Sequence, residues 1–261
     1  MTNEAKEEAV KLYESCVFDQ LLGETLRPGG LKLTARLAEV AGISSNYLVL
    51  DIACGKGTTA FFLARKYGCQ VIGIDLSDKM IASCRARAEE KEITSRVSFL
   101  LGDGENLPFS DSSFDTVISE CSFSLLPNKE VAARDIGRIL KPGGKLVMTD
   151  IILRGEVSKA LRRQVSFACC LAGAWRAEEY INLFEQVGLQ SPYIEDYSSE
   201  LRKIIFQLGT TFGSIDNFLA GLPAGPCQRK GTEGSTPSIL SYQEFLRLGK
   251  PGYALVAVSK K

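Results

Sequence analysis

The sequence of 261 residues contains no histidine. Histidine is the usual proton acceptor beside serine and cysteine nucleophiles, and it is the commonest nitrogen ligand of protein metal sites. Its absence therefore excludes Ser-His and Cys-His catalytic sites and histidine-metal sites within this chain. Any catalysis must use carboxylates, tyrosines, lysines, thiols or a cofactor.

An excess of charge of either sign is also missing. Lysine plus arginine total 31, aspartate plus glutamate total 31, and the formal net charge is zero. A general nucleic-acid-binding protein carries a basic excess, and a disordered acidic tail carries an acidic one, so neither class fits. The contents of 45% hydrophobic and 24% charged residues are those of an ordinary globular protein. We expect a small-molecule substrate rather than nucleic acid.

Long apolar runs and regular cysteine spacings are absent as well. No run of about 18 apolar residues occurs, so we expect no membrane-spanning helix. The first residues lack a basic start followed by an apolar core, so we expect no signal peptide and a cytoplasmic protein. The eight cysteines are spread irregularly and form no Cys-x-x-Cys pair. We therefore expect free thiols and no metal site.

What the chain does contain is an alternation of short apolar runs with helical patterns. Such an alternation is typical of a parallel sheet with right-handed crossovers. Strands are predicted at 47–51, 70–75, 97–101, 114–119, 145–149 and 253–259. Helices are predicted at 3–22, 33–40, 59–67, 77–91 and 129–140 and as the dominant elements of 157–220, and a Gly/Pro/Ser/Thr-rich loop or lid at 221–238.

These elements predict an α/β fold of the Rossmann-like type. We expect a seven-stranded, mostly parallel sheet with helices on both faces and an antiparallel last strand. The whole chain, residues 1–261, is interpreted as a single domain. Its predicted parts are an N-terminal helical cap at 1–40, a cofactor-binding core at 46–150, and a helical cover with the last strands at 151–261.

A glycine-rich turn, Asp51-Ile52-Ala53-Cys54-Gly55-Lys56-Gly57, follows the first predicted strand. Glycines let the backbone approach a ligand closely, and the next helix presents free amides at its N-terminus. Asp75 ends the second strand, where an acid can accept hydrogen bonds from both ribose hydroxyls. Gly102-Asp103-Gly104 follows the third strand. Taken alone, the glycines could form a plain tight turn and Asp75 could be a helix cap.

With Phe114-Asp115 and Lys141-Pro142-Gly143-Gly144 further along, residues of about 46–150 resemble the class I S-adenosylmethionine-dependent methyltransferases. The resemblance implies S-adenosylmethionine as the cofactor. It implies that the glycine turn holds the methionine end, that Asp75 holds the ribose, and that Asp103 contacts the adenine amine between Leu76 and Gly104. The cofactor-binding residues carried over are Asp51, Ala53, Gly55, Gly57, Asp75, Leu76, Asp103, Gly104 and Glu120, with Ala53 in place of the family's usual glycine.

Candidate substrate residues follow the fourth strand and lie on a later helix. Ligands of open α/β sheets bind beyond the carboxyl ends of the strands, which places Glu120, Cys121 and Ser122 near the methyl group. The segment Cys170-Leu171-Ala172-Gly173-Ala174 resembles the segment with a metalloid-binding cysteine in arsenite methyltransferases. In combination with Arg27-Pro28-Gly29-Gly30-Leu31 and Glu120-Cys121-Ser122, it is more similar to a related group of uncharacterised bacterial methyltransferases of anaerobes. The resemblance implies Cys170 as a ligand, and the place of Cys227 in the Gly/Pro-rich loop makes it the candidate for a third thiol. The paired N-terminal cysteines of the arsenite enzymes are not evident here.

Thiolates are soft ligands and suit a soft acceptor. The predicted function is therefore methyl transfer from S-adenosylmethionine to a small-molecule, thiophilic acceptor, a metalloid or a thiol, with Cys121, Cys170 and Glu120 as catalytic candidates. One alternative is a carbon or oxygen methyltransferase of an apolar metabolite, in which the cysteines pack and Glu120, Asp150 or a tyrosine is the base. The other is a cofactor-binding partner protein without catalysis. Neither the acceptor nor the oligomeric state follows from the residues.

Overall fold

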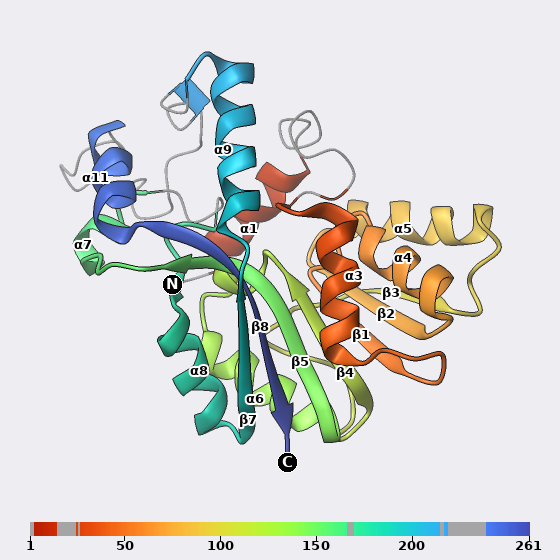
Figure 1. Ribbon diagram of the computed structural model, residues 1–261. Helices are drawn as coiled ribbons and strands as arrows, with labels where there is room; N and C mark the ends of the chain where they lie inside the picture. The colour runs from red at the N-terminus through yellow and green to blue at the C-terminus, as the bar shows by residue number, and fades with distance from the viewer. Residues whose placement is uncertain (1–2, 15–24, 26, 166–169, 215–216, 219–238) are drawn as a thin grey trace.

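The computed structural model describes residues 3–14, 25, 27–165, 170–214, 217–218 and 239–261 (Figure 1). At its centre is one sheet with the strand order β3-β2-β1-β4-β5-β8-β7. These strands are β1 (Leu48–Ile52), β2 (Gln70–Asp75), β3 (Val97–Leu101), β4 (Phe114–Glu120), β5 (Leu140–Leu153), β7 (Leu189–Asp196) and β8 (Pro251–Lys260). The short strand β6 (Trp175–Arg176) pairs with β5 outside this order.

The directions of the strands confirm the predicted sheet. Strand β1 pairs in parallel with β2 and β4, β2 with β3, and β4 with β5. Strand β8 runs antiparallel between β5 and β7. The carboxyl ends of the parallel strands therefore meet at one edge of the sheet, the upper edge in Figure 1. The loops that follow these strands can line a common site there.

The prediction that helices dominate 157–220 did not locate strands β6 and β7, which lie within this range. Strand β7 is an edge strand in which only Leu189 is buried, so it lacks the apolar alternation that marks a strand in sequence. Its ladder shifts register between Gln190 and Tyr193, around Pro192. Proline and an irregular ladder are both tolerated at a sheet edge, where one row of backbone groups has no strand partner.

Helices cover both faces of the sheet, as predicted (Figure 1). One face carries α3 (Gly30–Ala41), α4 (Thr58–Tyr67) and α5 (Asp78–Glu90), and the other carries α6 (Lys129–Ile139) and α8 (Ala177–Gln186). Successive residues of a strand point to opposite faces. Val49 accordingly belongs to the first apolar core and Leu50 to the second, and both are fully buried.

Further helices lie beyond the carboxyl edge of the parallel strands (Figure 1). They are α1 (Asn3–Tyr13), α7 (Lys159–Arg162), α9 (Ser198–Phe212) and α11 (Ile239–Gly249). Helix α1 confirms the start of the helix predicted at 3–22, whereas residues 15–22 and the loop or lid predicted at 221–238 lie outside the described residues. Within the described ranges, no helix has the length and apolar character needed to cross a membrane. The division into cap, core and cover remains a prediction.

Candidate functional site

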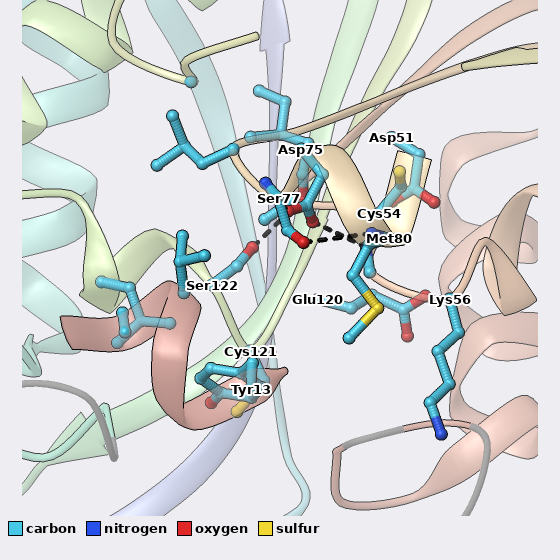
Figure 2. A pocket seen from close by; sticks show the side chains of 18 of the residues that line it. Tyr13, Asp51, Cys54, Lys56, Asp75, Ser77, Met80, Glu120, Cys121 and Ser122 are labelled. Atoms are coloured by element: carbon cyan, nitrogen blue, oxygen red, sulfur yellow. Dashed lines mark hydrogen bonds between the residues drawn. The ribbon is translucent and has the colours of Figure 1, made fainter. Parts of the chain in front are cut away.

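A pocket opens at the carboxyl edge of the parallel strands, between the loops that follow β1, β2, β3 and β4 and one side of α1 (Figure 2). The volume of the pocket is about 1090 Å³, which includes open solvent at its mouth. The predicted site residues that line it are Asp51, Ala53, Gly55, Asp75, Leu76, Gly104, Glu120 and Cys121. Gly57, Asp103 and Cys170 are not among the lining residues, but each shares a hydrogen bond with one of them: Gly57 with Cys54, Asp103 with Lys6, and Cys170 with Cys121.

The turn after β1 requires left-handed backbone at three positions. Ala53, Gly55 and Gly57 have φ angles of 56°, 50° and 70°. A side chain at Gly57 would also collide, because its Cβ would lie 2.9 Å from Sγ of Cys84. An alanine in this conformation costs roughly 1 kcal/mol more than a glycine. This strain at Ala53 explains why the family usually has glycine at the equivalent position.

Asp51 is a buried carboxylate with an open acceptor. The residue is 2% exposed, and its Oδ2 atom accepts no hydrogen bond from the described residues. Burial and the neighbouring carboxylate of Glu120 raise the pKa of Asp51 well above its usual range. Leaving such a group without a donor costs free energy. Asp51 therefore offers the pocket an acceptor for a ligand ammonium or hydroxyl group.

Asp75 ties the glycine turn to the start of α5. Its Oδ2 atom accepts a hydrogen bond of 2.8 Å from the backbone N–H of Gly55, and its Oδ1 atom accepts one of 2.9 Å from that of Ser77. Burial raises its pKa. Each carboxylate oxygen can accept two hydrogen bonds, so both oxygens retain capacity for ribose hydroxyls. Leu76, which is 39% exposed, lies next to Asp75 in the pocket wall. The ribose role of Asp75 stays a prediction.

The acid after β3 is held by a lysine from α1. Lys6 Nζ donates hydrogen bonds of 2.7 Å to Asp103 and 2.6 Å to Glu105. Gly102 and Gly104, on either side of Asp103, line the pocket, so its backbone borders the place predicted for adenine. Lys6 and Glu105 were not among the site residues predicted from the sequence. The only local signals for this contact were a lysine on the predicted N-terminal helix and a second acid two residues after Asp103. The adenine contact of Asp103 stays a prediction.

Glu120 belongs to a buried ion-pair network rather than standing alone in the pocket. Its Oε2 atom accepts a hydrogen bond of 2.6 Å from Nε of Arg27, and the hydroxyls of Thr34 and Thr59 also donate to its carboxylate. Arg27 in turn donates from Nη2 to both threonine hydroxyls. Because donors surround both oxygens, Glu120 has little capacity to take a proton from an acceptor. In sequence, the segment that begins at Arg27 indicated a chain break and contributed to the resemblance to methyltransferases of anaerobes, but the pairing of Arg27 with Glu120 was not predicted.

The two predicted cysteines come together although they are 49 residues apart in sequence. Sγ of Cys170 lies 4.0 Å from Sγ of Cys121, donates to the carbonyl oxygen of Cys121 at 3.3 Å, and lies 3.6 Å from the hydroxyl of Tyr13. Cys121 is partly exposed in the pocket (Figure 2), whereas Cys170 is 2% exposed. Hydrogen bonding to Cys170 and burial raise the pKa of Cys121 well above its usual range. The neighbouring Cys169 and the predicted third thiol, Cys227, lie outside the described residues.

Asp150, the other candidate base, lies on β5 beside these thiols and is fully buried. Its Oδ1 atom accepts from Ser124 Oγ and from the backbone N–H of Ile151, and its Oδ2 atom accepts from the backbone N–H of Ser124, each at 2.7 Å. Burial raises its pKa to about 6. These bonds fix η1 (Phe123–Leu125), whose Leu125 lines the pocket.

Lys129 lies in the same buried region. Its ammonium donates to the carbonyl oxygens of Ser124 and Leu126 at 3.0 and 2.9 Å. Burial lowers its pKa to about 8, and the carboxylate of Asp150 opposes that shift. The wall of the pocket after β4 is thus held by the buried acid Asp150, which was already a candidate from the sequence, and by the buried base Lys129, which was not.

Comparison with known proteins decides the family. Residues 43–188, more than half of the chain, match the model of the family described as Methyltransferase domain. The chain belongs to this methyltransferase family. It is an S-adenosylmethionine-dependent methyltransferase with a Rossmann-like fold.

Relatives of the methyltransferase differ in their acceptors. It is 31% identical to Methyltransferase GfsG of Streptomyces halstedii over 91% of this chain and 82% of the relative. It is 30% identical to 27-O-demethylrifamycin SV methyltransferase of Amycolatopsis mediterranei over 77% of this chain and 80% of the relative. An arsenite methyltransferase of Halobacterium salinarum is 29% identical over 61% of this chain but only 42% of the relative.

Solved structures show the same fold. The [4+2]-cyclase SpnF superposes with a TM-score of 0.67 at 25% identity, covering 88% of this chain and 80% of SpnF. Phosphoethanolamine N-methyltransferase 2 of Haemonchus contortus, solved with S-adenosyl-L-methionine, has a TM-score of 0.73 at 21% identity, covering 98% of this chain and 60% of that one.

Proposed function

We propose that the protein transfers the methyl group of S-adenosylmethionine to a small, soft acceptor, a thiol or a trivalent metalloid, bound against Cys121 and Cys170. The observation that carries this proposal is the pair of sulfurs 4.0 Å apart at the pocket. Soft, polarisable acceptors bind preferentially to sulfur ligands. An acceptor held there lies next to the loops that we assign to the cofactor.

The open acceptor of Asp51 supports the assigned cofactor site. A carboxylate oxygen that is buried and lacks a donor matches the ammonium group at the methionine end of S-adenosylmethionine. Around it, Ala53 and Gly55 bring the backbone close to that end, and Asp75 has capacity for the ribose hydroxyls. Leu76 and Gly104 border the space for the adenine ring. The residues of the pocket therefore fit the cofactor.

The chemistry of the site favours an acceptor that needs no strong base. When bound, S-adenosylmethionine supplies a methyl group on a positively charged sulfur. The chain has no histidine, and the carboxylate of Glu120 is occupied by Arg27 and two threonines. What the protein can provide is alignment of acceptor and methyl group, an effect worth about 7–11 kcal/mol in well-oriented reactions.

Methylation of a larger oxygen or carbon acceptor is the second candidate. The observation in its favour is that GfsG and the 27-O-demethylrifamycin SV methyltransferase match about four fifths of their own length, whereas the arsenite enzyme matches 42%. In this reading the cysteines pack, and Asp150 or Glu120 serves as base. Family membership favours an enzyme over the third alternative, a partner protein without catalysis.

Methyl transfer from labelled S-adenosylmethionine to arsenite and to small thiols tests the proposal, with the products identified by mass spectrometry. We expect product with at least one of them, and a loss of roughly 100-fold in Cys121→Ser and Cys170→Ser because the acceptor loses its alignment. Cys69→Ser is the matched control, since Cys69 is a buried free thiol that precedes β2 at the opposite edge of the sheet. Serine variants as active as the parent would show that the thiols do not hold the acceptor and would favour the second candidate.

A further inference from the structure

Three potential metal ligands meet beside the pocket. Sγ of Cys121, Sγ of Cys170 and a carboxylate oxygen of Asp150 all lie within 4.8 Å of one another. The two sulfurs are 4.0 Å apart. Thiolates bound to tetrahedral Zn²⁺ at about 2.3 Å lie about 3.8 Å from each other. The observed pair therefore needs a movement of only a few tenths of an ångström to hold such an ion.

The backbone fixes both thiols in this arrangement. Cys121 and Cys170 have φ angles of 56° and 65°, in the left-handed region that residues other than glycine seldom adopt. Each such residue is strained and persists where the surrounding structure enforces it. Two strained residues that meet at their sulfurs indicate that the position of the pair matters more than the stability lost there.

Asp150 is oriented in the way that metal-binding carboxylates are. Three hydrogen bonds hold it, two from Ser124 and one from the N–H of Ile151. Two of these bonds end on Oδ1 and one on Oδ2, so Oδ2 keeps a lone pair for a further partner. Hydrogen-bonded neighbours of this kind fix the geometry of ligands in metal sites.

The charges of the region also balance around a divalent cation. Two thiolates and one carboxylate carry three negative charges. A divalent ion and the buried ammonium of Lys129, which interacts electrostatically with Asp150, carry three positive ones. Burying a net charge is costly. Before an acceptor binds, a loaded cluster would be neutral as a whole, and the negative charge of a bound acceptor thiolate would face the positive sulfonium of the cofactor.

We propose that Cys121, Cys170 and Asp150 bind one thiophilic divalent cation of the Zn²⁺ class. The pocket side of the cluster, where Cys121 lines the wall and Tyr13 approaches Cys170, is left for a fourth ligand. We assign that position to a small thiol acceptor. This assignment of the acceptor rests on the proposed function, whereas the metal site itself does not.

Metal binding supplies what the chain lacks, a means of deprotonating the acceptor. A thiol that coordinates such an ion loses its proton outright, and the proton passes to solvent. The thiolate sulfur then forms a bond to the methyl carbon while the bond from that carbon to the sulfonium sulfur breaks. The electron pair of the broken bond stays on the sulfur of the cofactor. The balance is thiol plus S-adenosylmethionine giving methyl thioether, S-adenosylhomocysteine and a proton.

Equilibrium dialysis of the chelator-treated full chain against Zn²⁺ or Cd²⁺ tests the site without cofactor or acceptor. We expect one ion per chain and, with Cd²⁺, an ultraviolet absorption band from thiolate coordination. Cys121→Ser, Cys170→Ser and Asp150→Asn should each weaken binding by roughly 10–100-fold or more, the range found even for outer-shell partners. Cys69→Ser is the matched control and should bind as the parent does. Equal ion content in the parent and the Cys121→Ser/Cys170→Ser double variant would overturn the proposal.

A second measurement avoids any loss of folding in the variants. Bound Cd²⁺ should protect Cys121, the partly exposed thiol of the pair, from a maleimide in the parent chain, as read by peptide mass spectrometry, and unchanged labelling would contradict the site. Methylation of a small thiol should rise at least about tenfold on metal loading. An unchanged rate would refute the acceptor role. Intact metal binding in a chain that fails to bind S-adenosylmethionine would refute the proposed function and leave the metal site standing.

Discussion

Nε of Arg27 donates a hydrogen bond of 2.6 Å to Oε2 of Glu120, and both side chains are buried, with 7% and 4% of their surface exposed. The pair joins the segment before α3 to the carboxyl end of β4. Both residues line the pocket. One ion pair thus connects the N-terminal part of the chain to the strand that carries the thiol site.

Replacing Glu120 should therefore lower the free energy of unfolding first, and any effect on methyl transfer should be secondary. Glu120→Gln leaves the guanidinium of Arg27 buried without its counter-charge, and such losses are about 3–5 kcal/mol. Urea unfolding at neutral pH measures the loss. Lys203→Gln, which breaks the exposed pair between Lys203 and Glu200, is the control and should lose less than about 1 kcal/mol. An equal loss in the two variants would show that the buried pair is not the support that we describe.

Asp51→Asn should weaken binding of the cofactor without lowering the stability of the protein. The carboxylate is buried and Oδ2 lacks a donor, so removing its charge should leave the unfolding free energy unchanged or raise it. The same variant loses the charge that we assign to the cofactor ammonium, and its affinity for S-adenosylmethionine should fall by roughly tenfold or more. Calorimetric titration and thermal unfolding measure the two effects. A variant that is less stable but binds the cofactor normally would contradict the assigned role.

The sheet and the glycine turn were predictable because local rules decide them. A buried parallel strand such as β1 reads as an apolar run in any sequence, and left-handed backbone at Gly55 and Gly57 favours glycine. The edge strand β7 obeys neither rule, because only Leu189 is buried. Its pairing with β8 depends on a segment more than fifty residues away along the chain.

The interior of the site depended on contacts between distant segments. Cys170 was found only through a resemblance, and no spacing rule places its sulfur 4.0 Å from that of Cys121. Asp150 was considered as a base on β5, but its bonds to Ser124 come from tertiary packing. The link from Arg27 to Glu120 spans 93 residues. Sequence patterns located the cofactor loops, whereas the buried charges between them required the structure.

Lys6 should control how long the cofactor stays bound. Helix α1 lies along the pocket, and Lys6 joins it to Asp103 and Glu105 at 2.7 and 2.6 Å. Lys6→Met keeps the apolar stem but removes both ion pairs, which are worth up to about 1 kcal/mol each near a surface. Dissociation of S-adenosylmethionine, followed by stopped-flow displacement, should become roughly fivefold faster. Lys11→Met alters an exposed lysine of the same helix, and dissociation should stay at the parent rate. Equal rates of cofactor dissociation in the parent and the two variants would show that the ion pairs of α1 do not control release of the cofactor.

Glu195 should make stability sensitive to acid. The guanidinium of Arg36 donates to this carboxylate, as do the hydroxyls of Tyr193 and Tyr197. These hydrogen bonds lower the pKa of Glu195 from 4.5 to about 2, and the one from Arg36 has the largest effect. A carboxyl whose folded pKa is lowered contributes stability above its unfolded pKa and loses that contribution as pH falls through the folded value.

The expected window therefore runs from pH 4.5 down to about 2. In urea unfolding across it, Glu195→Gln should start less stable than the parent and lose less stability as pH falls, so the two curves converge. Glu39→Gln removes the weaker, exposed partner of Arg36 at 3.3 Å and should keep the parent's acid dependence. Parallel curves for the parent and Glu195→Gln would mean that the contact between α3 and β7 contributes nothing to folding, and the acid sensitivity would then belong to other carboxylates.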